Sequence, residues 1–274
     1  MTTKIVGILN ITPDSFSDGG KFDSLDGALN HLQQMINDGA DIIDIGAEST
    51  RPQAKPITAD EEWQRLEKIL PPVISIAKNA SRQVKTSIDS YHFSTIKKSY
   101  ELGIDIINDV SSLIDEKIIA FIAEKNLPTI LMHNQKIQED ADCVINRNLN
   151  LADKIIDWAK EKIADLKKKN ISSSQLIFDP GIGFAKNALQ SISILKNITK
   201  FHKIGLPIYL GHSKKSFLDA IDFSNYGENL DRSQKTLIIS KYLIAQKIDF
   251  IRVHDVELTK KIKLKESKDL YFGI

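Results

Sequence analysis

The chain has 274 residues, of which 42% are hydrophobic and 27% are charged, and its formal net charge is +1. This balance is typical of a globular protein, and the absence of a charge surplus argues against nucleic acid or a membrane surface as the main partner. The length suits two small domains or one α/β barrel of about 250 residues. The single cysteine, Cys143, excludes an internal disulfide framework and a multi-cysteine metal site.

The first apolar run, residues 4–9, is rich in residues that favour β-structure and predicts a buried strand. It is too short for a signal peptide, and no other stretch approaches a membrane span, so the expected location is the cytoplasm. Asn10 follows the strand, and then comes a polar loop punctuated by Pro13 and Gly19-Gly20. We interpret this loop as a mobile arm at the mouth of an active site, with an ordinary surface loop as the alternative.

Helical and strand patterns alternate along the rest of the chain. Further strands are predicted at 41–47, 84–88, 104–107, 128–132, 176–178, 207–210 and 249–253. A first helix is marked by residues 25–36 and ended by Gly39, and another begins near Phe93 and is closed by Gly103. Further helices are predicted from about 59 to 78, around 118–122 and 151–166, near 192–200, at 236–245 and near Leu258. Pro71-Pro72 must break or kink the helix predicted from 59 to 78.

Eight strands that alternate with helices predict a parallel sheet, because parallel neighbours need crossover connections. No linker or change of composition divides the chain. We therefore predict a single domain over residues 1–274 with the α/β fold of one (β/α)8 TIM barrel, in preference to an open doubly wound sheet.

Polar or charged residues stand at the ends of six predicted strands. In a (β/α)8 barrel these ends meet on one face, which is where such enzymes place their chemistry. Each residue alone is explained as well by a polar cap on a buried strand, but the set together predicts an active site. The residues are Asn10, Asp89, Asn108, His133, Asp179, and Arg252 with His254.

The segment 178–186 is rich in glycine, but it does not predict a dinucleotide site. The third glycine of G-x-G-x-x-G would fall at Lys186, and no P-loop motif occurs elsewhere in the chain. Gly181 and Gly183 are better explained by backbone that passes close to a flat ligand.

Eight segments together resemble the dihydropteroate synthase family along nearly the whole chain, in the family's order and spacing. That family is a (β/α)8 barrel, usually a homodimer, which joins 6-hydroxymethyl-7,8-dihydropterin diphosphate to 4-aminobenzoate and releases diphosphate. The segments are GILNITPDSFSDGG, DIGAESTRP, TSIDS, INDVSS, LMHN, FDPGIGFAK, GHSKKSF and IRVHDV.

The resemblance implies a pterin pocket. Asp179 would accept two hydrogen bonds from the amino group and ring N–H of the pterin, and Asp89 and Asn108 would fix other ring atoms. Lys215 would bind the acceptor edge, and Arg252 would stack on the ring face. Met132 matches the floor of the pocket.

The resemblance also implies a diphosphate side and two loops that close over it. Asn10, Arg252 and His254 match the diphosphate residues, and Asn10 also matches the ligand of a Mg²⁺ cofactor, which needs few protein ligands because it keeps several waters. The expected catalytic residues are Asp14, Asp18, Arg51 and Lys215, with Thr50 contacting both substrates. A His254-Asp255 metal phosphohydrolase dyad is a weaker alternative.

For 4-aminobenzoate the resemblance implies an aromatic wall and a carboxylate anchor. The wall residues are Phe184 and Pro52, with Phe16 from the first loop, and the anchor is Ser216, helped by the helix N-terminus that follows Lys215. The reaction would be dissociative: the C–O bond breaks first, and the methylene cation is delocalised into the dihydropterin.

The partners expected are these two small molecules and a second copy of the chain. Apolar residues cover more than one face of the predicted helix 236–245, and the surplus predicts a homodimer, with cover by residues 270–274 as the alternative.

Several positions depart from the family pattern. The family usually has Gly at the positions of Ala47, Ala185 and Lys235, and Arg at that of Lys214. After Lys186 it often carries His-Asn, where this chain has Gln190-Ser191. None removes a residue assigned to pterin, diphosphate or metal, but Ala185 and Lys214 border the aminobenzoate side.

Two other functions fit part of the pattern. A pterin-barrel methyltransferase would share a pocket of the Asp89, Asn108 and Asp179 type, but it has no use for the diphosphate residues Asn10 and His254. A non-catalytic paralogue that binds pterin or a partner protein is the alternative from another class, and turnover of the two substrates separates it from the enzyme.

Overall fold

The computed structural model describes residues 2–12, 24–48, 55–134 and 151–264. Within these residues eight β-strands form one sheet whose paired neighbours are all parallel. The strands are β1 (Lys4–Asn10), β2 (Ile42–Gly46), β3 (Lys85–Asp89), β4 (Ile106–Asp109), β5 (Thr129–Met132), β6 (Leu176–Asp179), β7 (Tyr209–Leu210) and β8 (Phe250–Val253).

The sheet closes on itself. Its strand order is β6-β5-β4-β3-β2-β1-β8-β7. The two strands at the ends of that order also meet, because Phe178 forms a parallel bridge with Ile208 and its N–H donates to the Pro207 carbonyl at 2.8 Å. The predicted (β/α)8 barrel is therefore confirmed.

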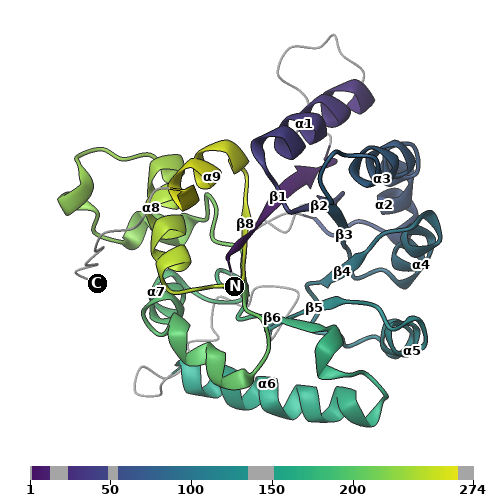
Figure 1. Ribbon diagram of the computed structural model, residues 1–274. Coiled ribbons are helices and arrows are strands. Elements are labelled where there is room, and N and C mark those ends of the chain that lie inside the picture. The colour runs from purple at the N-terminus through teal and green to yellow at the C-terminus, as the bar shows by residue number, and fades with distance from the viewer. Residues whose placement is uncertain (1, 13–23, 49–54, 135–150, 265–274) are drawn as a thin grey trace.

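Helices lie around the outside of the sheet (Figure 1). The α-helices are α1 (Ser24–Asp38), α2 (Ala59–Leu66), α3 (Leu70–Lys78), α4 (Phe93–Leu102), α5 (Glu116–Lys125), α6 (Leu151–Lys168), α7 (Ala188–Lys196), α8 (Arg232–Ala245) and α9 (Val256–Leu264). Short 3₁₀ helices are η1 (Ser173–Gln175), η2 (Ile198–Ile204), η3 (Ser216–Ala220) and η4 (Ser224–Tyr226). None of the described helices combines the length and apolarity that a membrane crossing requires.

The predicted helix 59–78 is two helices. A capping box begins the first, in which the Thr58 hydroxyl accepts from the Glu61 N–H and the Glu61 carboxylate accepts from the Thr58 N–H. Pro71-Pro72 lie in the first turn of α3, where backbone N–H groups have no partner within the helix. The two prolines therefore begin a second helix instead of kinking a long one.

Several other boundaries also differ from the prediction; for example, α8 begins at Arg232 and β7 at Tyr209. The fourth strand begins at Ile106, because the Ile104 N–H still donates to the Ser99 carbonyl at the end of α4. The helix predicted at 192–200 is α7, which begins earlier because Asn187 and Gln190 form a capping box, and it is followed by η2. The capping signal at Asn187 could have been found in the sequence.

The barrel has two apolar cores, one on each face of the sheet. The larger fills the space between the strands and the outer helices. The smaller lies inside the barrel, and its members alternate along the strands with residues of the first core, as the pleat of a strand requires. The inner core consists of Val6, Ile42, Ile106, Ile130, Tyr209 and Phe250, with Ile177 packed against it.

Candidate active site

Predicted site residues lie at the carboxyl ends of the strands on the inner side of the barrel. Asp89 is paired in register with Asn108, and Met132 with Asp179, so the members of each pair point to the same face. Asn10 and Asp89 are both paired with Gly46, which places them on that face as well. The strand register therefore brings these residues to one face of the sheet.

Arg252 connects both sides of the barrel interior. Its Nε donates to Asp44 at 2.7 Å, and its Nη2 donates to Asp89 at 2.9 Å. In the sheet order only β1 separates β8 from β2, so Arg252 reaches past the inner face of β1 to Asp44. Since a guanidinium has five N–H donors, part of it remains available to a ligand.

Asp44 is a site residue that the sequence analysis did not single out. It is fully buried and accepts from Ser87 at 2.6 Å and from the Asn108 amide at 3.0 Å, besides Arg252. The amide of Asn108 is thereby held with its donor group toward Asp44, which leaves its carbonyl oxygen for another partner. The sequence did contain a signal for this residue, because Asp44 is an acid within an apolar strand and lies two residues before Gly46.

Asp179 presents a carboxylate with one oxygen in use. Its side chain is buried, and Oδ1 accepts from the Gly181 N–H at 2.7 Å. Among the described residues no donor is hydrogen-bonded to Oδ2. Burial raises the pKa of Asp179, and the positive charge of Lys215 opposes that rise. A ligand that brings N–H donors would satisfy this carboxylate in its charged form.

Burial also perturbs the pKa values of Asp89 and Lys215. It raises the pKa of Asp89 to about 7 against the opposing charge of Arg252, and it lowers the pKa of Lys215 to about 8 against that of Asp179. Groups that titrate near neutral pH at one end of a barrel are typical of a functional site.

Lys215 links the predicted pterin and aminobenzoate sides. Its Nζ donates to the Ile182 carbonyl at 2.5 Å and lies 4.4 Å from the centre of the Phe184 ring. Gly183 has a φ of +75°, and a Cβ there would lie 3.0 Å from Lys215 Cδ, so the glycine lets the backbone pass this side chain.

Ser216 is exposed at the start of η3. The expected helix at this point is thus a five-residue 3₁₀ helix, whose end carries little dipole.

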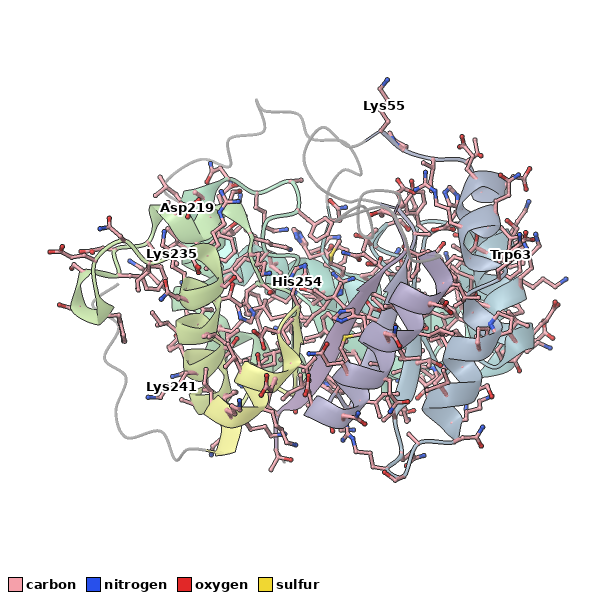
Figure 2. All side chains as sticks on the ribbon, turned by 90° about the horizontal axis from the view of Figure 1, so that it is seen from above. Lys55, Trp63, Asp219, Lys235, Lys241 and His254 are labelled. Atoms are coloured by element: carbon pink, nitrogen blue, oxygen red, sulfur yellow. The ribbon has the colours of Figure 1, made fainter. Side chains whose placement is uncertain are left out.

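On the predicted diphosphate side, His254 and Asn10 differ in their contacts. The Ser213 hydroxyl lies 2.8 Å from His254 Nδ1, which orients the imidazole. Figure 2 shows His254 in the middle of the molecule, whereas Asp219 and Lys235 lie toward one side.

The side chain of Asn10 makes no hydrogen bond within the described residues, so its amide oxygen is available to a cation. The described part of the chain has no cluster of three or more His, Cys, Asp or Glu that could hold a metal.

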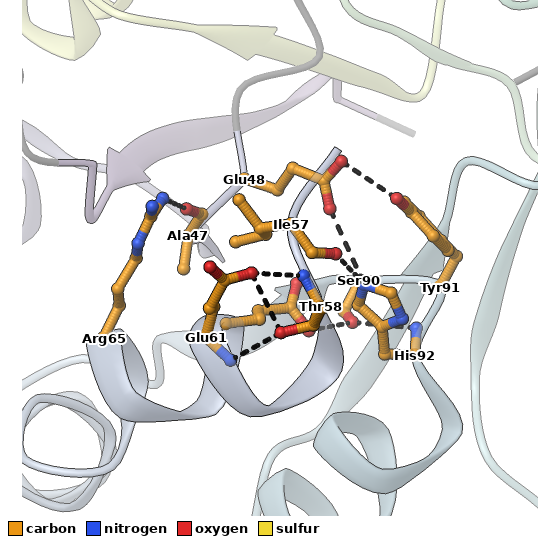
Figure 3. Close-up of polar contacts among 10 residues, drawn as sticks. Ala47, Glu48, Ile57, Thr58, Glu61, Arg65, Ser90, Tyr91 and His92 are labelled. Atoms are coloured by element: carbon orange, nitrogen blue, oxygen red, sulfur yellow. Dashed lines mark hydrogen bonds and ion pairs between the residues drawn. The ribbon is translucent and has the colours of Figure 1, made fainter. Parts of the chain in front are cut away.

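Glu48 and Ile57, which flank the segment 49–54, contact residues that follow β3 (Figure 3). The Tyr91 hydroxyl donates to Glu48 at 2.9 Å, and His92 Nε2 lies 3.1 Å from the Ile57 carbonyl and 3.7 Å from Glu48. On the other side of Glu48, Arg65 donates to the Ala47 carbonyl at 2.7 Å. These contacts fix the chain on each side of the predicted loop residues. Six predicted site residues lie outside the described residues: Asp14, Phe16, Asp18, Thr50, Arg51 and Pro52.

One polar strand end does not join the site. His133 directly follows Met132 and therefore points to the opposite face of the sheet, where it is buried edge-to-face against Trp158 of α6 at 4.8 Å. Burial lowers the pKa of His133 to about 3, which keeps the ring neutral. For this residue the simpler explanation, a polar cap on a buried strand, is the better one.

Comparison with known proteins agrees with this geometry. The family model described as "Pterin binding enzyme" matches residues 6–254. A dihydropteroate synthase of Clostridium beijerinckii is 37% identical over 255 residues, which cover 93% of this chain and 89% of that protein.

Two solved structures are similar along most of their length. One is a dihydropteroate synthase of Anaplasma phagocytophilum with bound 6-hydroxymethylpterin-monophosphate, with a TM-score of 0.83, 41% identity, and coverage of 96% of this chain and 97% of that one. Another is a dihydropteroate synthase of Xanthomonas albilineans with 4-aminobenzoic acid, with a TM-score of 0.82, 26% identity, and coverage of 96% and 91%. The chain therefore belongs to the pterin-binding enzyme family, among its dihydropteroate synthases.

Proposed function

We propose that this transferase condenses 6-hydroxymethyl-7,8-dihydropterin diphosphate with 4-aminobenzoate and releases diphosphate, in folate biosynthesis. One observation carries the proposal. At one end of the barrel Asp179 has an oxygen that no described residue bonds, the positive charge of Lys215 acts on its pKa, and Arg252 is fixed between two acids. A flat ring with a donor edge and an acceptor edge complements this arrangement.

Each pocket residue contacts a different part of the pterin. Asp179 accepts from the amino group and the adjacent ring N–H, and Lys215 donates to the acceptor edge. The carbonyl of Asn108 and the carboxylate of Asp89 bind further ring atoms. Arg252 lies against the ring face, because its two ion pairs prevent the guanidinium from turning away. Met132, which is buried and paired with Asp179, forms the floor.

The chemistry follows from the ring that these residues hold. The bond between the methylene carbon and the diphosphate oxygen breaks first, and the electron pair leaves with diphosphate. The cation that remains is delocalised into the dihydropterin ring. The amino nitrogen of 4-aminobenzoate then forms the new C–N bond and loses a proton to solvent or to the departing diphosphate. The residues orient both substrates and limit access of water, so no strong base is required.

Mg²⁺ is the proposed cofactor. A bound Mg²⁺ would neutralise part of the charge that develops on diphosphate. Asn10 fits a magnesium ligand because its amide oxygen has no other partner in the described part of the chain, and Mg²⁺ commonly takes few protein ligands beside phosphate oxygens and waters. His254, oriented by Ser213, would donate to the leaving diphosphate.

Phe184 and Ser216 form part of the proposed aminobenzoate subsite. Phe184 supplies an aromatic wall next to Lys215, and Ser216 is exposed beside it, where a carboxylate can reach its hydroxyl. The roles of Phe16, Thr50 and Pro52 toward this substrate, and those of Asp14, Asp18 and Arg51 in catalysis, remain predictions from the resemblance.

The test is turnover of the two substrates by the purified chain with Mg²⁺. Formation of dihydropteroate, followed by chromatography, is expected, with the Arg252→Leu variant as a control that should be inactive. Tight binding of 6-hydroxymethylpterin without product at saturating substrate would identify a non-catalytic paralogue. Methyl transfer from a methylated tetrahydropterin, with no product from the diphosphate substrate, would identify the methyltransferase.

We also propose a homodimer that is located in the cytoplasm. In α8 Ile239 and Leu243 are buried in this chain, while Leu237, Ile238, Tyr242 and Ile244 are only partly covered. A helix that needs one buried stripe thus carries apolar surface that a second copy would cover. Light scattering at micromolar concentration is expected to give twice the chain mass, and a monomer mass would refute the dimer.

A further inference from the structure

The ammonium group of Lys186 is fully engaged by backbone. Its Nζ lies 3.0 Å from the carbonyl oxygen of His133, 2.9 Å from that of Gly181 and 3.0 Å from that of Phe184. An ammonium has three N–H donors and no acceptor, so three carbonyls use all of its donors. Its donors are therefore occupied by backbone and are not available to bind substrate, and burial lowers the pKa of Lys186 to about 7.

The three carbonyls belong to two segments of the chain. His133 directly follows β5, whereas Gly181 and Phe184 belong to the turn that follows β6. Lys186 thus attaches this turn to the end of the neighbouring strand. The attachment is close, because a Cβ on Gly181 would lie 2.1 Å from the His133 carbonyl oxygen and 3.1 Å from the Lys186 ammonium.

The turn does not hold its shape by local preference alone. Gly181, Gly183 and Ala185 all have positive φ angles, of 67°, 75° and 46°. Left-handed conformation is unfavourable for alanine, and two glycines in three residues leave the free chain many alternative shapes. Side-chain contacts must therefore help to select this conformation, and Lys186 provides three: two to carbonyls of the turn and one to the carbonyl of His133, which follows β5.

Phe184 is the functional residue that this turn carries. Lys186 holds its backbone carbonyl from one side, and the Lys215 ammonium lies over its ring on the other. If the carbonyl contact is lost, the ring loses its fixed position relative to Lys215. Arg252 depends on other contacts, those to Asp44 and Asp89, whereas Asp179 accepts from the Gly181 N–H and so touches one end of the same turn.

We propose that Lys186 is a positioning residue that fixes the Phe184 wall and so determines how 4-aminobenzoate is held. This inference rests on the proposed function, in which Phe184 contacts the second substrate. Lysine suits the position because a compact ammonium can direct three donors to three converging carbonyls. Arginine spreads its donors in a plane, and methionine keeps an unbranched side chain, one atom shorter, that has no N–H donor.

The test is Lys186→Met, with Lys196→Met on the exposed end of α7 as the matched control. Steady-state kinetics should show the KM for 4-aminobenzoate raised roughly tenfold or more, because misplacing a substrate-positioning group has effects of that size. The calorimetric Kd for 6-hydroxymethylpterin should rise by a clearly smaller factor, because Arg252 and Asp89 hold each other without any contact from the turn, and Lys196→Met should change neither quantity.

Two results would overturn the proposal. An unchanged KM for 4-aminobenzoate in a folded Lys186→Met protein would show that the wall does not need the lysine. Equal losses for pterin and aminobenzoate would show a general structural role. If Lys186→Met does not fold, Lys186→Arg provides the same comparison, because it keeps the charge near Asp179 but cannot reach all three carbonyls.

The failure of the proposed function is distinguishable from these outcomes. If the parent protein itself forms no dihydropteroate, the assignment of the reaction fails independently of Lys186. Equilibrium binding of 4-aminobenzoate to the protein with pterin and Mg²⁺-diphosphate then still compares the parent chain with Lys186→Met. A weaker affinity in the variant would support the positioning role, and equal affinities would refute it.

Discussion

The two halves of the barrel interior are built from the same strands but differ in chemistry. In β2 Ile42 belongs to the inner apolar core, and two residues later Asp44 binds Arg252. The same step leads from Phe250 to Arg252 in β8. The amino-terminal half contributes apolar packing, whereas the carboxyl-terminal half contains Asp89 and Asp179, whose pKa values are raised by burial. The amino-terminal half of the interior thus stabilises the fold, and the carboxyl-terminal half carries the proposed binding residues.

The largest expected effect comes from the apolar half. Ile130→Ala should lower the free energy of unfolding by about 2–5 kcal/mol, because a buried side chain of the inner core is replaced by a cavity. Urea unfolding measures the change. Ile114→Ala, at a side chain that is 63% exposed, should remain within about 0.5 kcal/mol. Pterin affinity of the folded Ile130→Ala protein should be unchanged, and a large loss would mean that the two halves are not separate.

The next effect comes from the polar half. Asp179→Asn should weaken binding of 6-hydroxymethylpterin by about 2–4 kcal/mol, or roughly 30- to 900-fold in Kd, because a charged acceptor pair is lost. Titration calorimetry tests this. Asp249→Asn is the matched control, because Asp249 also accepts from a backbone N–H, that of Ile208 at 2.8 Å, but at the opposite end of the barrel. Equal affinities in all three proteins would remove Asp179 from the pocket.

The same substitution should stabilise the empty protein at neutral and alkaline pH. Since burial raises the pKa of Asp179 in the folded state, the folded protein holds this proton more tightly than the unfolded chain does. The resulting stability is present at low pH and is lost as the pH rises through the folded-state pKa. Asparagine imitates the protonated acid, so the melting temperature of Asp179→Asn should exceed that of the parent at about pH 8 and converge with it as the solution is acidified. A variant that melts lower at every pH would contradict this sign.

A smaller effect is expected where the two halves meet. Tyr209 is 1% exposed inside the barrel, and no described residue bonds to its hydroxyl. Tyr209→Phe should therefore raise the free energy of unfolding by about 1 kcal/mol, because a buried unpaired hydroxyl is removed. Tyr242→Phe is the contrasting variant and should lose about 1 kcal/mol, since the Tyr242 hydroxyl donates to the Leu195 carbonyl at 3.2 Å. A loss of stability in Tyr209→Phe would show that a partner, such as a buried water, engages this hydroxyl.

The smallest effect concerns a departure from the family pattern. Ala185 has a φ of 46°, in the left-handed region that glycine adopts at no cost. Ala185→Gly should raise the free energy of unfolding by about 0.5 kcal/mol, because glycine removes the backbone strain of the folded state. The greater conformational freedom that glycine gives the unfolded chain offsets part of this gain. Ala120→Gly, at an exposed position within α5, should instead lower it by about 0.5–1 kcal/mol. Thermal unfolding of the two variants measures the difference in sign.

Much of the fold was predictable because its signals are local. Apolar runs of strand length, helical spacing between them and turn residues at their ends identified eight alternating units, and parallel strands need such crossovers. The boundaries that were wrong depended on caps, such as Asn187 and the pair Thr58 and Glu61, or on prolines that begin a helix. These signals are short and are easily outweighed by the apolar pattern around them.

The sequence by itself determined which residues end the strands, and the resemblance gave most of them a role. Only the tertiary structure decided which of them share the inside of the barrel: Met132 faces inward, and its neighbour His133 faces Trp158. It also revealed Asp44, whose partner Arg252 is 208 positions away, and Lys186, whose ammonium bonds the His133 carbonyl 53 positions away. The physical reason is that strand pleat and barrel closure determine which side chains meet, and both depend on pairing between distant segments.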